Sequence, residues 1–113
     1  MNVYDCANEL SRAIRQSHEY AKLKEATDVL GMESEAKKMV DEFLVLNQEA
    51  EISKYQGKEP EKETIEKIQK LYSVLSLNRD AMDYLNAFMR FQMMMADIAK
   101  SIQDATKDLV GVK

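Results

Sequence analysis

Few side chains in this chain of 113 residues are of the types that commonly carry chemistry. His18 is the one histidine, which excludes a metal site or a catalytic triad that needs two histidines. Cys6 is the one cysteine and cannot form an internal disulfide. Its neighbours Asp5 and Glu9 are acidic, whereas a reactive thiolate is favoured by a basic or helix-terminal setting. We interpret Cys6 as a small apolar residue of a helix and His18 as an exposed residue beside a helix cap.

Sulfur and carboxylate groups near the C-terminus are two further kinds of metal ligand. Four methionines cluster there: Met89, Met93, Met94 and Met95. Methionine sulfurs can bind copper(I), but this stretch has no cysteine or histidine to support such a site. The aspartates of the same region lie outside its apolar positions, and the chain has no Glu-x-x-His motif of the kind that holds metal in helical bundles. We predict no catalytic residue, no metal site and no cofactor.

The composition indicates that helices position these residues. The chain has 3 Gly and 1 Pro, and its abundant Ala, Leu, Met, Glu and Lys are good helix formers. Apolar periodicity predicts about five helices in a single all-α domain spanning residues 1–113. They are expected at residues 3–16, 18–30, 34–56, 61–77 and 79–109.

Residues typical of helix ends separate these segments. Ser17, Ser34 and Asn78 stand where N-terminal caps are needed. Gly31 stands where a helix can end in a left-handed conformation. The Gly-Lys-Glu-Pro sequence at residues 57–60 is the clearest break in the chain and precedes the fourth predicted helix.

The last predicted helix has the most informative pattern. One row of apolar residues follows it in steps of three and four: Ala81, Tyr84, Phe88, Phe91, Met95, Ile98, Ile102, Ala105 and Leu109. A second row lies beside the first: Met82, Leu85, Met89, Met93, Ala96 and Ala99. Two adjacent rows are too wide for one neighbouring helix to cover. Because a helix over residues 79–109 would also extend on the order of 45 Å, we expect an elongated bundle that a second copy of the chain completes.

We accordingly predict a homodimer in which the last helix forms the core or the interface. The residues assigned to that role are Tyr84, Phe88, Phe91, Met94, Met95, Ile98 and Ile102. Met94 lies off both rows and is expected to be exposed or in an interface, whereas Met89, Met93 and Met95 are expected to fill the core.

Charge and hydropathy narrow the class of partner. The formal net charge is −4 and the pI is about 5.1, whereas dedicated nucleic-acid binders normally carry a basic patch. The first residues lack a basic region followed by an apolar core, and the apolar run Met93–Ala96 is far too short to span a membrane. We expect a cytoplasmic protein that binds neither nucleic acid directly nor a membrane.

Three segments carry a resemblance to a known family. They are EYAKLKEA at residues 19–26, EAKKMVDEF at residues 35–43, and the helix from Asn78 to Ile102 with Tyr84-Leu85 near its start. Through these packing motifs the chain resembles the YlbF/YmcA-like family of small helical bacterial proteins, and specifically its YheA-type branch. The resemblance extends over almost the whole chain. The resemblance implies an all-helical fold, dimers and an origin in Firmicutes.

The resemblance also suggests a regulatory role. Some members of the family regulate competence, sporulation and biofilm formation, and act in a complex that influences RNA processing by an endoribonuclease. Some also carry cysteines linked to an iron–sulfur cluster, a pattern from which this chain departs because it has Cys6 alone. The cluster-dependent role is therefore not carried over, and the family offers no catalytic residue to transfer.

We predict a non-enzymatic helical adaptor or regulator that acts through protein–protein interaction. It would present the Glu/Lys-rich arm at residues 49–70, or the outer face of the first helix, to another protein. The alternative is a small-molecule-binding protein or an enzyme with a pocket between helices, built on Tyr20, Tyr72 or Tyr84. A concave pocket with converging polar groups would favour that alternative.

Overall fold

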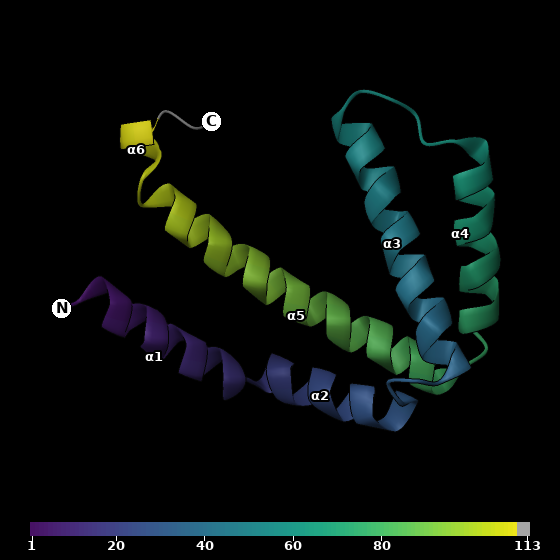
Figure 1. Cartoon of the computed structure of the whole chain (residues 1–113), viewed down its shortest axis with the longest axis horizontal. Coiled ribbons are helices and arrows are strands. Elements are labelled where there is room, and N and C mark those ends of the chain that lie inside the picture. The colour runs from purple at the N-terminus through teal and green to yellow at the C-terminus, as the bar shows by residue number, and fades with distance from the viewer. Residues whose placement is uncertain (111–113) are drawn as a thin grey trace. The chain divides into compact units, whose positions relative to one another are not determined.

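The structure is a computed structural model that describes residues 1–110. Over this range the chain forms six α-helices and no strand (Figure 1), which confirms the predicted all-α class. The helices are α1 (Val3–Arg15), α2 (His18–Leu30), α3 (Glu35–Tyr55), α4 (Lys62–Leu75), α5 (Arg79–Asp104) and α6 (Lys107–Val110). They belong to two compact units: unit 1 comprises residues 1–25 and the chain from Asn86 onward, and unit 2 comprises residues 26–85. That the chain is a single domain stays a prediction.

Side-chain oxygens cap four of the helices at their N-termini, where backbone amides lack partners within the helix. Each oxygen accepts a hydrogen bond from an amide two or three residues on, at 2.7 to 3.1 Å: Asn2 from Tyr4, Ser17 from Tyr20, Ser34 from Lys37, and Asn78 from Ala81. The last three caps confirm the sequence prediction. The cap at Asn2 was missed because the pattern was followed only from Val3.

Two glycines adopt the left-handed conformation that side chains with a Cβ disfavour. Gly31, after α2, has a φ of 86°, and Gly57, after α3, has a φ of 75°. Both therefore end a helix in the manner that the sequence indicates. Helix α4 begins after Pro60, with Glu61 at its N-cap position but without a side-chain cap hydrogen bond.

The last helix is shorter than predicted. The expected helix over residues 79–109 ends at Asp104 and is followed by the separate short helix α6. The amide of Ala105 is shared between the carbonyls of Ser101 and Ile102, and the amide of Thr106 donates to the carbonyl of Gln103, three residues back instead of the four of an α-helix. Every residue from 101 to 110 is exposed, so no packing opposes this tightening of the last turn.

Unit 2 has a core formed within its own residues. Helices α3 and α4 pack side by side as a hairpin joined by the loop after Gly57 (Figure 1). Its fully buried large side chains are Val40 and Leu75, and the ring of Phe43 lies 5.8 Å from that of Tyr72. The other buried apolar residues of this unit are Leu30, Ala50, Ala81, Tyr84 and Leu85.

Unit 1 is built from α1, the first part of α2, the greater part of α5, and α6. The rings of Tyr20 on α2 and Phe91 on α5 join two of these segments, with their centroids 6.5 Å apart and their planes inclined by 57°. The guanidinium of Arg15 lies 5.4 Å above the Tyr20 ring, a favourable cation–π distance. Ala87 is the one buried residue among the described residues of this unit.

Candidate interaction surface

The predicted interface residues fall into three groups by burial. Tyr84 is buried in the core of unit 2, where the ammonium of Lys37 lies 5.4 Å from its ring centroid. Ile102, at the other end of the row, has 59% of its surface exposed. The members between them are half-buried in unit 1: Phe88, Phe91, Met94, Met95 and Ile98. The burial of side chains in this row therefore decreases along α5 from its N-terminus towards its C-terminus.

The second row of α5 is uncovered beyond its first turns. Leu85 is buried in unit 2, but Met89 and Met93 expose 59% and 65% of their surfaces. The prediction that Met89 and Met93 fill the core is therefore wrong for the single chain. Met94, which was expected to be exposed or in an interface, is half-buried. The reason is that the neighbouring segment covers only one side of α5, which cannot enclose two rows.

Helix α1 presents a third apolar surface. Its row consists of Val3, Cys6, Ala7, Leu10, Ala13 and Ile14, and no residue of this helix is buried. Cys6 is a half-buried free thiol, and Leu10, at the middle of the row, is exposed. The sequence showed this row, but we had assigned the interface to the last helix alone. The uncovered apolar row of α1 is therefore a second candidate surface for association, beside the α5 rows.

Lys37 is a second feature that sequence reasoning missed. Its side chain is 9% exposed, and its ammonium donates to Asp41 one helical turn away at 2.7 Å. The same ammonium lies over the ring of Tyr84, so the charge is satisfied on two sides. The i, i+4 spacing of Lys37 and Asp41 can be seen in the sequence. The sequence does not show that an aromatic ring contacts the lysine. This cluster fixes α3 against the start of α5 within unit 2.

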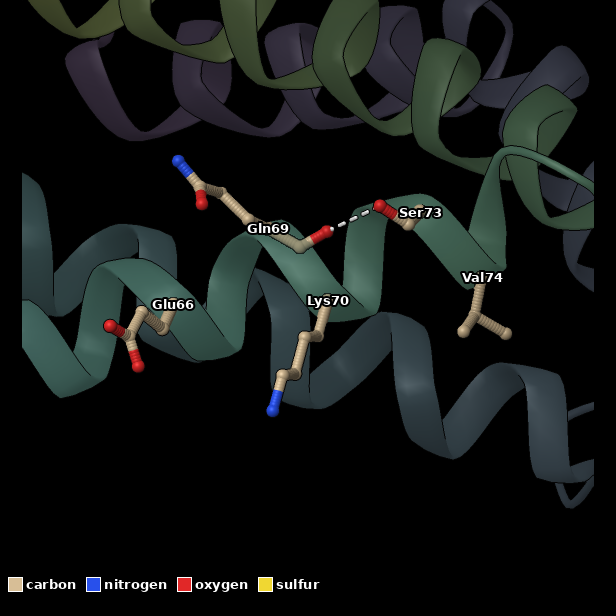
Figure 2. A pocket seen from close by; sticks show the side chains of 5 residues that line it. All are labelled: Glu66, Gln69, Lys70, Ser73 and Val74. Atoms are coloured by element: carbon tan, nitrogen blue, oxygen red, sulfur yellow. Dashed lines mark hydrogen bonds between the residues drawn. The ribbon is translucent and has the colours of Figure 1, made fainter.

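An open surface hollow lies along α4. It is lined by five side chains of that one helix: Glu66, Gln69, Lys70, Ser73 and Val74. Figure 2 shows them spread along the helix, with the hydroxyl of Ser73 donating to the backbone carbonyl of Gln69 at 2.9 Å. Because that bond stays within the helix and the other side chains diverge into solvent, the hollow lacks the converging polar groups of a binding pocket.

The three tyrosines considered for a pocket each pack on a different neighbour. Tyr20 lies between Arg15 and Phe91, Tyr72 lies against Phe43, and Tyr84 lies beneath Lys37. These contacts are those of aromatic residues that join helices.

Residues 1–110 were also the range in which metal-binding clusters and membrane-spanning helices could be assessed from the structure. No group of three or more His, Cys, Asp and Glu side chains in this range is placed to hold a metal ion. No helix in the same range is both long and apolar enough to span a membrane.

Comparison with known proteins places the chain in a family. Residues 3–106 match the family model described as "Control of competence regulator ComK, YlbF/YmcA". A UPF0342 protein of Caldicellulosiruptor saccharolyticus is 36% identical over 104 residues, which cover 92% of this chain and 87% of that protein. A UPF0342 protein of Bacillus licheniformis is 30% identical over 111 residues, covering 98% and 95%. A third, of Streptococcus sanguinis, is 30% identical over 109 residues, covering 96% and 97%. The chain thus belongs to the YlbF/YmcA family, as its packing motifs indicated.

Proposed function

We propose that this protein is a non-enzymatic helical adaptor of the cytoplasm that acts as a homodimer and binds other proteins. The observation that carries the proposal is the apolar surface that unit 1 leaves in solvent, on α1 and on the second half of α5. Contiguous apolar surface of this kind marks sites of association on soluble proteins. The description of the family model, which concerns the control of a regulator, supports a regulatory role.

The homodimer would use the row that runs along α5 to Ile102, together with the apolar row of α1. Phe91, Met95 and Ile98 are already half-covered by the chain itself. A second copy would complete their burial, which is favourable by about 25 cal/mol per Å² of apolar surface. Both rows belong to unit 1, and in a two-fold symmetric dimer the same patch of each copy would lie at the interface.

Two other surfaces are then available to a partner protein. Met89 and Met93 lie one turn apart on the second row of α5, and flexible methionine side chains suit a surface that adapts to different partners. The arm at residues 49–70 exposes Ile52 and Tyr55 near the end of α3. Exposed tyrosines are frequent among the residues that contribute most to binding.

Ile102→Glu is expected to weaken the homodimer, because the substitution places a charge in a surface that becomes apolar and dry on association. Ser101→Glu is the matched control, since Ser101 is the adjacent exposed residue and lies off both apolar rows. Sedimentation velocity measures this at a fixed protein concentration in the micromolar range. The sedimentation coefficient of Ile102→Glu should shift towards that of the monomer, and that of Ser101→Glu should equal the wild-type value. If both variants sediment like the wild type, the end of the α5 row is not in the interface.

A further inference from the structure

The two units differ in how much apolar surface they bury. Within the described chain, unit 2 buries seven apolar residues and Lys37, whereas unit 1 buries Ala87 alone. The segments that meet in unit 1 do so through half-buried side chains such as Tyr20 and Phe91. Unit 1 therefore has several helices held together by half-buried side chains, with hardly any fully buried ones.

A unit that buries its apolar side chains only in part gains little to offset the entropy lost when its chain is ordered. Helices α1 and α2 have 13 residues each, and isolated helices of about 12–15 residues are only marginally formed in water. Capping by Asn2 and Ser17 stabilises the first turns of these helices, but one cap per helix does not offset the entropy of ordering 13 residues. Tertiary cover must come from elsewhere if α1 is to remain helical.

We infer that unit 1 becomes ordered only when a second copy of the chain covers its apolar rows. Folding of unit 1 and dimerisation are then one equilibrium, while unit 2 stays folded in the monomer and in the dimer. This inference rests on the proposed homodimer and adds a regulatory property to it. The protein concentration sets the fraction of chains in which α1 and the second half of α5 are ordered, and so the fraction that can act as an adaptor.

The charges of α1 favour a second copy as the covering surface. Asp5 and Glu9 lie in the first half of the helix, and Arg12 and Arg15 lie in the second half. An antiparallel copy brings the acidic half of each helix beside the basic half of the other, and it also sets the two helix dipoles in opposition. With two acidic and two basic residues, α1 has no net charge to attract an anionic or a cationic surface of another kind.

Hydrogen exchange measured by mass spectrometry, on the full chain at a series of concentrations, tests this inference. When the protein is diluted through the midpoint of dimer dissociation, amides at residues 3–15 and 86–104 are expected to exchange at least about tenfold faster, as local unfolding requires. Amides at residues 35–55 and 62–75 should keep their protection, because the core of unit 2 lies within one chain.

The variant Leu10→Glu allows hydrogen exchange in the monomer and in the dimer to be compared at a single protein concentration. Leu10 is an exposed member of the α1 row, and Asn8→Glu is the matched control because Asn8 is an exposed residue outside that row. Leu10→Glu is expected to be monomeric, with fast exchange in unit 1 and wild-type protection in unit 2. Asn8→Glu should match the wild type in both respects.

Several outcomes would overturn the inference. If a monomeric Leu10→Glu keeps wild-type protection in unit 1, the inference is wrong while the homodimer stands. If Leu10→Glu stays dimeric and protected, the α1 row is not covered by a second copy. If unit 2 loses its protection together with unit 1, the two units do not fold separately. If the wild type is monomeric at every concentration, the homodimer and the inference both fail.

Discussion

Leu75→Ala is expected to lower the free energy of unfolding by about 2–5 kcal/mol, the range for truncating a large apolar side chain in a packed core. Leu75 ends α4 and is 1% exposed, in the unit that buries most of the apolar residues of this chain. Truncation would remove its packing contacts and leave a cavity that helices α3 and α4 can only partly close. Urea denaturation followed by circular dichroism measures the loss.

The matched control is Leu77→Ala, two residues away. Leu77 is 88% exposed, so the same substitution is expected to change the free energy of unfolding by no more than about 0.5 kcal/mol. Equal denaturation midpoints for the two variants would show that α4 does not face α3 as the structure has it.

Phe91→Ala is expected to cost about 3–5 kcal/mol at concentrations where the dimer is populated. Within one chain Phe91 is only half-buried, against Tyr20. Contacts within one chain therefore account for only part of the expected loss of stability. The full loss is expected only where a second copy completes the burial of the Phe91 ring. Thermal or urea denaturation at high protein concentration gives the value, and the loss should shrink on dilution because a disordered unit 1 no longer buries the ring.

Met93→Ala is the control for this prediction. Met93 lies on the same helix, but its side chain is 65% exposed on the second row. Its truncation should leave the free energy of unfolding within about 0.5 kcal/mol of the wild type. A loss below about 1 kcal/mol for Phe91→Ala at high concentration, well short of the range for a core aromatic, would mean that Phe91 is not an anchor of the interface.

The helices could be predicted from the sequence because each has its own local signals. The caps at Ser17, Ser34 and Asn78 and the left-handed Gly31 each act within a few residues. The break at residues 105–106 could not be predicted in this way. Apolar periodicity continues through Ala105 to Leu109, but a helical pattern persists in structure only where packing supports it, and residues 101–110 are exposed.

The candidate surface was predictable in kind but not in detail. The two rows of α5 showed that one neighbour would not suffice, yet they did not show which row the chain itself would cover. Phe91 and Met95 are half-buried while Met89 and Met93 are exposed, because the side of α5 that faces Tyr20 is decided by tertiary packing. The contact of the Lys37 ammonium with the Tyr84 ring depends likewise on segments far apart in sequence.

Sedimentation equilibrium of the wild-type protein across the micromolar range tests the central claim most directly. We expect a mass of about twice the 13.0 kDa of the chain at the upper concentrations, since burial of the α1 and α5 rows in a symmetric interface favours association. The mass should fall towards that of the monomer on dilution. A mass that stays at 13.0 kDa throughout would contradict the proposal that a second copy covers the apolar surface of unit 1.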